Sequence, residues 1–577
     1  MAGYNQKDES YPEVIKNSAY ATSEDGANAP IVTSEQELRP IEYGEYERTS
    51  LHRGLKARQI TMIAIGGAIG TGLLIGTGSA LARAGPGSVF ISYTIVGFIV
   101  YLVLCALGEM AAWLPLSSGF TGYATRFCDP ALGFALGWTY WFKYIIITPN
   151  QLTAGALVLQ YWVDRDRVNP GVFITVFLIA IVIINWLGIK IFGEFEFWLS
   201  SIKVIVIIGV ILLSFILALG GGPNHDRTGF RYWKDPGAFA EYIDDGATGR
   251  FLGFWSTMVT ATFAYLGTEL VGVTVGEAQN PRKTVPRAIK LTFYRILFFY
   301  CLSVLLLGMI VPYDSDELAF ANKSSTSASA SPFVVAIQLA GINSLPGILN
   351  GCICLFVFSA ANSDLYIASR TLYGLASEGC APRIFRRTNN SGVPYMALGA
   401  SVTFCLLAYL NVAQSSKTVF LYFVNLVTIF GLETWISILV THICFVRARK
   451  AQNLPDSSMP FVAPFGIYGS YGALFMCVLI ALTKNYPAFT KGTYGDFDYK
   501  TFITGYLGIP IYLALIFGYK LYTKSKGVKP HEADFYTGKD LIDREEEEFL
   551  AAKAAKEKDG VQAKGNWFYR HFLAWLF

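Results

Sequence analysis

Long apolar stretches alternate with short polar ones between about residue 60 and residue 522. A bilayer core about 30 Å thick needs about 20 residues of apolar helix for each crossing, and about twelve stretches reach that length. The predicted spans cover residues 60–82, 87–112, 131–161, 171–190, 195–219, 251–276, 288–312, 346–376, 394–412, 418–446, 463–484 and 502–522. The pattern predicts an all-α polytopic membrane protein with about twelve transmembrane helices.

The first apolar stretch contains an unusual run of small residues, Gly66-Gly67-Ala68-Ile69-Gly70-Thr71-Gly72. Each glycine costs roughly 1 kcal/mol in a helix interior, so the run predicts a break in the first helix. Breaks at membrane depth occur where protein buries the backbone or where a cavity uses its free N–H and C=O groups. The alternative is a close helix–helix contact through small residues.

A second interruption occurs in the sixth apolar stretch, at residues 263–269, and Gly272 and Gly276 follow it. It contains Glu269, and a carboxylate inside a spanning segment is rare and usually functional. Helices one and six are equivalent members of two five-helix halves, and matching interruptions indicate an inverted-repeat transporter with broken helices 1 and 6. We therefore expect a twelve-helix transporter domain at 59–522, in which repeat one covers about 59–219, repeat two about 251–446 and two extra helices about 463–522.

Composition excludes several other classes of protein. The 577 residues are 53% hydrophobic and 15% charged, with a net charge of +4 and no basic stripe for nucleic acid. The nine cysteines form no C-x-x-C pair or disulfide framework. The sequence has no HExxH, P-loop or GxSxG motif and no metal-spaced cluster, so we expect no enzyme activity, no cofactor and no ATP-driven transport.

Lys and Arg residues concentrate in the loops that would be cytoplasmic if both termini lie inside the cell. Residues 1–58 and 523–577 then form cytoplasmic, hydrophilic tails, which we expect to be mobile. The start of the chain has no short apolar core typical of a signal peptide. This orientation places Asn322, in the glycosylation sequon Asn322-Lys323-Ser324, in an outer loop.

Several long motifs occur in the order found in one transporter family. They are Gly66 to Gly72, Gly193-Glu194-Phe195-Glu196-Phe197-Trp198, Ile202-Lys203, Phe263 to Glu269, and Glu277-Ala278-Gln279-Asn280-Pro281-Arg282. From about residue 50 to 525 the chain resembles fungal amino acid permeases of the amino acid–polyamine–organocation superfamily. Within that family it is most similar to permeases for acidic, dicarboxylic amino acids, through Trp141 to Tyr144, Pro149 to Ala154, Gly221 to Arg227 and Ser359 to Tyr366.

An amino acid offers a carboxylate and an ammonium group to a binding site. Backbone N–H groups at the start of a half-helix favour anions, so we expect the carboxylate to meet Ala68, Ile69, Gly70, Thr71 and Gly72. The ammonium would meet carbonyl groups around Phe263, Ala264 and Tyr265. The resemblance implies the same arrangement, with Phe263 as a lid over the substrate; the alternative is an ordinary packed aromatic residue.

Three polar residues are candidates for reading the substrate side chain. Lys143 lies among apolar residues of the third span, where an ammonium is costly unless it pairs or snorkels to the interface. It could instead meet the side-chain carboxylate of glutamate or aspartate. Gln151 stands where permeases for cationic and neutral amino acids often have Glu, and an amide removes repulsion against an acidic substrate. Asp364 carries a charge of the opposite kind and could pair with Lys143 or handle protons.

Lys203 and Glu269 are the candidates for proton coupling. The resemblance to proton-coupled relatives implies that Lys203 replaces a bound sodium ion, and a buried ammonium can release and regain a proton as access alternates. Glu269 would be the complementary titrating group. The alternative for either residue is a structural ion pair.

We therefore expect a plasma-membrane proton symporter that imports L-glutamate and L-aspartate by alternating access. Its partners would be the amino acid, protons and the lipid bilayer, with ubiquitin-ligase adaptors acting on the tails at Lys7 or Lys16, as in similar permeases. A broad-range or neutral amino acid permease, in which Lys143 is only structural, and an amino-acid-sensing receptor are the alternatives.

Overall fold

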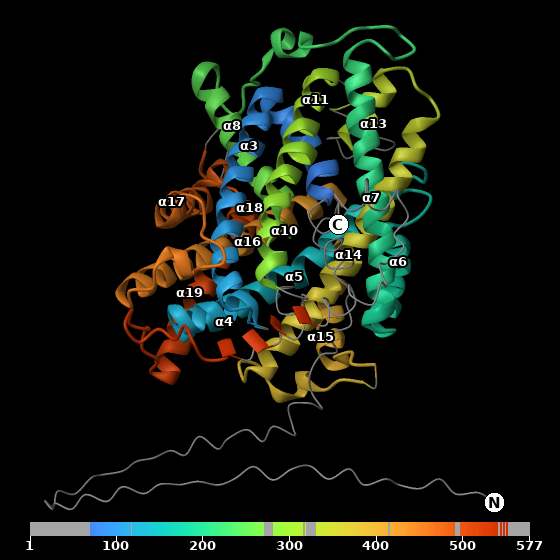
Figure 1. The fold of residues 1–577 in the computed structure, drawn as a ribbon. Coiled ribbons are helices and arrows are strands. Elements are labelled where there is room, and N and C mark those ends of the chain that lie inside the picture. The colour runs from blue at the N-terminus through green and yellow to red at the C-terminus, as the bar shows by residue number, and fades with distance from the viewer. Residues whose placement is uncertain are drawn as a thin grey trace, which may run out of the picture. The chain divides into compact units, whose positions relative to one another are not determined.

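The computed structural model of the protein describes residues 70–551, apart from residues 117, 271–280, 316–317, 319–330, 390, 413–415, 491–496, 541–542, 545 and 548–549. Every regular element within these ranges is a helix, so the prediction of an all-α protein is confirmed for them (Figure 1). Residues outside the described ranges include the whole predicted N-terminal tail, the end of the C-terminal tail from residue 552, and Ala68, Ile69 and Asn322.

The helices follow the chain in this order: η1 (Gly72–Gly76), α3 (Thr77–Trp113), α4 (Gly119–Phe127), α5 (Pro130–Leu159), α6 (Pro170–Trp186), α7 (Ile189–Ala218), η2 (Trp233–Gly237), α8 (Gly246–Tyr265), α10 (Pro281–Arg295), η4 (Ile296–Cys301), α11 (Leu302–Ile310), α13 (Pro332–Leu339), α14 (Leu345–Ser377), η5 (Arg383–Arg386), α15 (Tyr395–Cys405), η6 (Leu406–Val412), α16 (Ser416–Ala451), η7 (Asp456–Ser458), α17 (Gly466–Thr483), η8 (Tyr486–Phe489), α18 (Tyr499–Tyr506) and α19 (Gly508–Thr523).

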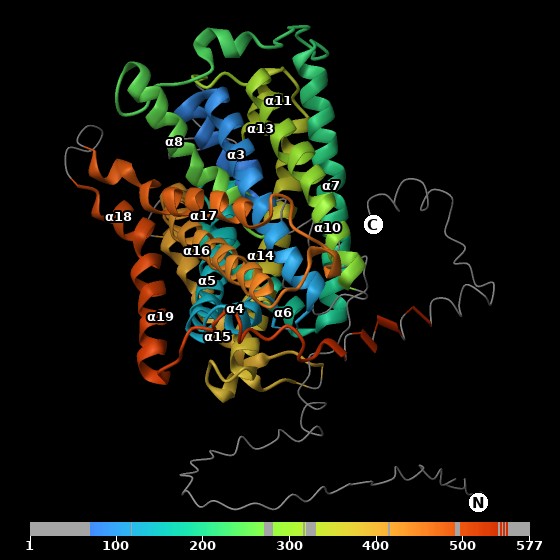
Figure 2. The same cartoon turned by 60° about the vertical axis from the view of Figure 1, so that its left-hand side comes forward.

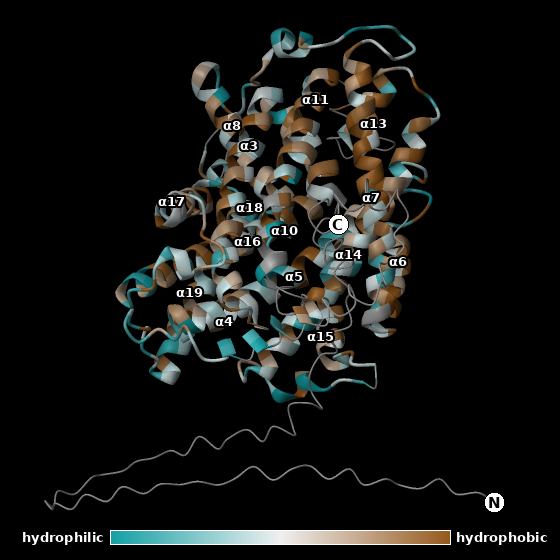
Figure 3. Ribbon diagram, viewed as in Figure 1, coloured by the Kyte–Doolittle hydropathy of each residue, from teal (hydrophilic) through white to brown (hydrophobic). Residues whose placement is uncertain are grey.

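Eight helices of the described residues are long and apolar enough to cross a membrane. Figure 3 shows the apolar colour along α7, whereas connecting loops are more hydrophilic. The first of the eight, Gly72–Trp113, contains the end of the first predicted span and all of the second, which meet at a kink where Gly85 has φ 80° and precedes Pro86. This backbone conformation favours glycine. The apolar helix α6 has 17 residues and is shorter than the eight.

Five long helices form the centre of the described part of the molecule. Helix α5 packs against α14 and α16, while α3 packs against α8 (Figures 1 and 2). Leu, Ile, Val and aromatic side chains from all five helices share one buried apolar cluster. The second predicted break is present, because α8 ends at Tyr265, Leu266 is extended and Gly267 has φ 96°. The chain therefore leaves its helical path next to α5 and α14.

The beginning of the C-terminal segment differs from the expected mobile tail. Phe535 is fully buried and its ring lies against Trp113, Phe127 and Phe445. Arg126 of α4 forms an ion pair of 2.6 Å with Asp534. The expectation of mobility was wrong for this part of the segment, because Phe535 packs into an apolar site between helices and holds the polar residues around it in place.

Candidate functional site

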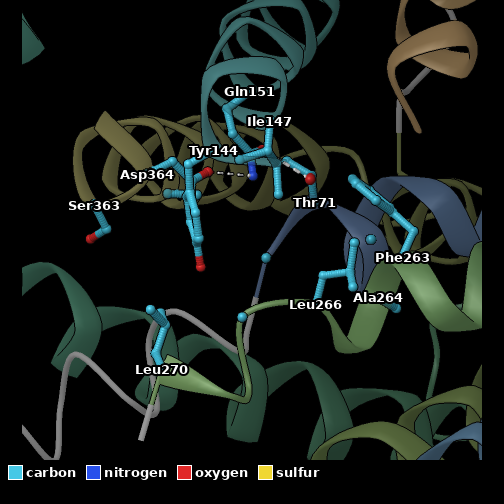
Figure 4. A pocket seen from close by; sticks show the side chains of 14 residues that line it. Thr71, Tyr144, Ile147, Gln151, Phe263, Ala264, Leu266, Leu270, Ser363 and Asp364 are labelled. Atoms are coloured by element: carbon cyan, nitrogen blue, oxygen red, sulfur yellow. Dashed lines mark hydrogen bonds between the residues drawn. The ribbon is translucent and has the colours of Figure 1, made fainter. Parts of the chain in front are cut away.

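A pocket lies where residues 70–72, the described part of the first predicted break, and the second break face α5 and α14 (Figure 4). Its wall consists of four groups: Gly70, Thr71 and Gly72 from the first break; Tyr144, Ile147 and Gln151 from α5; Phe263, Ala264, Leu266, Gly267 and Leu270 from the end of α8 and the second break; and Ala360, Ser363 and Asp364 from α14. Seven of the predicted binding residues line this pocket: Gly70, Thr71, Gly72, Gln151, Phe263, Ala264 and Asp364.

Gly72, where η1 begins, and the end of α8 approach each other backbone to backbone. A Cβ atom added to Gly72 would lie 2.4 Å from the Cα atom of Ala264, which is closer than real Cβ contacts come. A Cβ atom at Gly70 would meet no heavy atom within 4 Å. Close packing explains the glycine at position 72, while position 70 borders open space. The packing interpretation therefore applies to Gly72, and the interpretation of the run as a helix break stays a prediction.

Gln151 connects the first break to α14. Its Oε1 atom accepts a hydrogen bond of 2.9 Å from the hydroxyl of Thr71, and its Nε2 atom donates one of 3.2 Å to Oδ2 of Asp364 (Figure 4). All three side chains are buried and line the pocket. Because an amide can donate and accept at once, glutamine at this position holds a hydroxyl and a carboxyl group together.

Lys143 lies behind the pocket wall. Its side chain is fully buried, and its ammonium forms an ion pair with Glu269 and not with Asp364. The rings of Tyr140 and Tyr144 lie 5.2 and 4.9 Å from Nζ, and Tyr144 itself lines the pocket. Lys143 was expected to face the cavity, but it does not line the pocket. The Glu269 carboxylate and two tyrosine rings surround its ammonium instead.

Glu269 lies beside the second break and is also fully buried. Besides Lys143, it accepts hydrogen bonds of 3.1 Å from the backbone N–H of Gly267 and 3.4 Å from the indole of Trp435. Since Gly267 lines the pocket, the carboxylate lies directly behind that part of the wall. The charge of Lys143 thus neutralises the Glu269 carboxylate, which is separated from the pocket by Gly267.

Lys203 belongs to a second buried ion pair. Its Nζ atom lies 3.8 Å from Oε1 of Glu196, which also accepts hydrogen bonds from Ser200 of α7 at 3.1 Å and Ser359 of α14 at 2.6 Å. Lys203 and Glu269, the predicted proton-coupling residues, therefore have different ion-pair partners. Both Lys143 and Lys203 interact electrostatically with Asp364, so the two pairs and the pocket carboxyl form one charged group.

Comparison with known proteins identifies the family. The amino acid permease family model matches residues 59–531, which is most of the chain. This chain belongs to the amino acid permease family. The permease is 55% identical over 539 residues to the dicarboxylic amino acid permease of Saccharomyces cerevisiae, an alignment that covers 92% of this chain and 88% of the relative. It is thus a transporter of the amino acid permease family and a multi-pass membrane protein.

Two further relatives cover similar shares of the permease. An uncharacterized amino-acid permease of Schizosaccharomyces pombe is 47% identical, covering 85% of this chain and 92% of the relative. The proline-specific permease of Emericella nidulans is 39% identical, covering 92% and 94% of the two chains. The predicted resemblance to fungal amino acid permeases is therefore confirmed.

Two predicted aromatic residues of the permease, Phe263 and Tyr265, differ in their relation to the pocket. Phe263 lines the pocket and also makes an edge-to-face contact with Phe420, at 6.0 Å between ring centroids. Tyr265 does not line it: its hydroxyl donates to the carbonyl of Tyr93 at 3.0 Å and its ring stacks on Tyr300. Among the described residues, no group of His, Cys, Asp and Glu side chains could hold a metal ion.

Sequence reasoning missed several pocket residues. Ile147 lies four residues and Tyr144 seven residues before Gln151 on the same face of α5, so helical spacing from Gln151 could have found them. Ser363, next to Asp364, has a buried hydroxyl without a hydrogen-bond partner in the described structure. Lys203 and Glu196 both belong to α7 and lie seven residues apart, which is two helical turns, so helical spacing could have found their pairing.

Proposed function

We propose that this permease imports acidic amino acids, L-glutamate and L-aspartate, together with protons. The observation that carries the proposal is the pocket between residues 70–72 and the second break, with the amide of Gln151 and the carboxyl of Asp364 hydrogen-bonded to each other on its wall. The name of the Saccharomyces cerevisiae relative, 55% identical to this chain, supports the substrate class.

The groups common to all amino acids would bind at the breaks. The backbone at Gly70 to Gly72, where η1 begins, would receive the substrate carboxylate, because helix N-termini present free N–H groups and a positive dipole end. Ala68 and Ile69 precede this point in the chain. The ammonium would meet carbonyl oxygens near Phe263 and Ala264, with Phe263 as the lid.

Selectivity for a second carboxylate would come from removing negative charge near the pocket. Gln151 supplies an uncharged donor on α5, and Lys143 neutralises Glu269 behind Gly267. A substrate carboxylate at this end of the pocket would otherwise face uncompensated like charge. Lys143 would thus favour binding of an acidic substrate indirectly, by neutralising the negative charge of Glu269.

Proton symport would supply the driving force. An acidic amino acid is an anion, and an inside-negative membrane potential opposes its entry by about 2.3 kcal/mol per charge and 100 mV. Lys203 and Glu269 are the proposed coupling residues. Both are buried in ion pairs next to α14, where a change in access could alter their protonation.

The proposed architecture has twelve transmembrane helices in a five-plus-five inverted repeat with two additional helices. We place the permease in the plasma membrane with both termini in the cytoplasm, so that α4 and the C-terminal segment lie on the cytoplasmic side. Asn322 would then be a glycosylation candidate on the outside, and Lys7 and Lys16 candidate sites for ubiquitin-ligase adaptors.

The second candidate is a neutral or broad-range amino acid permease. The position of Lys143 behind Tyr144 favours it, because the charge does not line the pocket. Competition against labelled glutamate uptake in cells separates the two. Unlabelled aspartate should compete as well as glutamate, and equal competition by alanine or proline would contradict acidic selectivity. Accumulation of label also distinguishes a transporter from a receptor, which would bind glutamate without accumulating it.

A further inference from the structure

The buried charges around the pocket do not balance. Lys143 and Lys203 are the two cations of the group, and Glu269, Glu196 and Asp364 are its three carboxyls. Each lysine has a carboxylate of its own. Asp364 forms no ion pair with any described residue and has one hydrogen-bond donor, the amide of Gln151.

Asp364 is also the carboxyl of this group that reaches the pocket. It is 9% exposed and lines the pocket, whereas Glu196 and Glu269 are fully buried behind the wall. The titratable side chains facing it are Lys143, Tyr140 and Tyr144 from α5 and Lys203 and Glu196 from α7. An isolated buried carboxylate is strongly unfavourable, and such groups commonly take up a proton instead.

We propose that Asp364 carries a proton that travels with the substrate. The proton would pass from outside water to an Oδ atom of Asp364 before or with substrate binding, and from there to cytoplasmic water after substrate release. With this proton bound, the charged group is neutral, and the pocket can accept an anionic amino acid. This inference rests on the proposed symport and adds Asp364 to Lys203 and Glu269 as a proton-handling residue.

Proton uptake on substrate binding tests the assignment with the purified, full-length permease in weakly buffered detergent solution containing a pH indicator. Linkage predicts that the wild-type protein takes up about one proton for each glutamate that binds. Asp364→Asn should bind glutamate with about no proton uptake, and Asp364→Glu should restore the uptake. Glu433→Gln is the matched control, because Glu433 is equally buried and forms no ion pair with a described residue, but lies outside the pocket lining.

Three results would overturn the assignment. They are glutamate binding to the wild-type protein without proton uptake, unchanged uptake in Asp364→Asn, and loss of glutamate binding in Asp364→Asn at every pH while its thermal unfolding is normal. The last would show that the substrate ammonium needs this carboxylate. The wild-type measurement stands even if a variant does not fold. Absence of glutamate binding to the wild-type protein would instead contradict the proposed function.

A different observation concerns the C-terminal segment, residues 525–546. It begins beside α4, where the backbone N–H of Val528 donates to the carbonyl of Cys128 at 2.8 Å, and it is fixed by Asp534 and the buried Phe535. Further along, Arg282 at the start of α10 forms ion pairs with Asp543 and Glu546, the latter at 2.9 Å. One segment thus bridges α4 and α10.

We infer that this segment is a strap that restrains opening of the permease on this face. Helix α10 begins at Pro281, C-terminal to the second break, whereas α4 leads into α5, which forms another wall of the pocket. Any opening that moves α10 away from α4 would have to break the ion pairs of Arg282 or of Arg126. This inference is independent of the substrate and of proton coupling.

The triple variant Asp534→Asn, Asp543→Asn and Glu546→Gln removes the carboxylates of the strap, and Asp540→Asn is the control because Asp540 is exposed. We expect the initial rate of substrate uptake to rise roughly twofold to tenfold in the triple variant, as expected for losing two or three partly exposed ion pairs. Maleimide labelling of Cys128 and Cys444, located by mass spectrometry, should accelerate. Unchanged labelling, or uptake no faster than in the control, would overturn the strap.

Discussion

Replacing Lys143 with Met should weaken the binding of acidic amino acids although the substitution removes no atom from the pocket lining. The change leaves the Glu269 carboxylate without its cation, directly behind Gly267. At an effective dielectric constant of about 20, this charge would repel a substrate carboxylate at about 7 Å by about 2 kcal/mol. That energy corresponds to a roughly 30-fold higher Kd for glutamate.

Equilibrium binding to the purified permease measures this effect, with glutamine as the uncharged isostere of glutamate. Lys143→Met should raise the Kd for glutamate and leave that for glutamine within about threefold. The double variant Lys143→Met, Glu269→Gln removes both charges, so it should return to within about threefold of wild-type affinity. A double variant as weak as the single one would show that Lys143 binds the substrate directly. Unchanged glutamate binding in Lys143→Met would mean that the charge of Glu269 does not reach the substrate.

Thermal unfolding provides an independent check on the same pair. Removing one partner of a buried ion pair leaves an uncompensated charge and costs about 3–5 kcal/mol. Lys143→Met should therefore unfold at a markedly lower temperature than the wild-type protein, and the double variant should recover most of the difference. Equal unfolding temperatures for all three proteins would contradict the buried ion pair.

Three further predictions follow from the pocket and the strap. Gly72→Ala should abolish uptake or reduce the amount of folded protein, because the added Cβ would overlap the backbone of α8, at a cost of about 1–3 kcal/mol or more; Gly70→Ala should leave the amount of folded protein unchanged. Gln151→Glu should raise the KM for glutamate about tenfold or more, since it places a second carboxyl on the pocket wall, and a KM equal to wild type would remove Gln151 from selectivity. Burial raises the pKa of Asp534, but hydrogen bonds from Thr537 and Arg126 outweigh burial and lower that pKa below its usual value. The contact should therefore persist above the unfolded pKa of about 4 and weaken only as the pH falls through the lower folded value; thiol labelling that accelerates already between about pH 7 and pH 5 would contradict this.

The position of the second break could be predicted from the sequence, because a glycine and an intramembrane carboxylate are local signals. Gly70 to Gly72 and Phe263 to Ala264, which these local signals singled out, line the pocket. The kink at Gly85 separates two predicted spans for the same local reason. Gln151 and Asp364 were singled out through the resemblance to the permease family, and both line the pocket.

The partners of the buried charges could not be predicted in the same way. Lys143 was expected to meet the substrate carboxylate or to pair with Asp364, whereas its ion pair with Glu269 depends on how the second break packs against α5. The docking of Phe535 was hidden by the polar residues around it, since average hydropathy does not register one aromatic side chain. Such pairings belong to tertiary packing, which sequence periodicity does not encode.

Uptake of labelled glutamate by proteoliposomes containing only the purified permease examines proton-coupled transport of acidic amino acids without other cellular components. With the membrane potential held at zero, an inward proton gradient of one pH unit should drive about tenfold accumulation for each coupled proton. Excess aspartate, but not alanine, should abolish it. Glutamate that only equilibrates, or alanine that accumulates equally well, would contradict the proposed function.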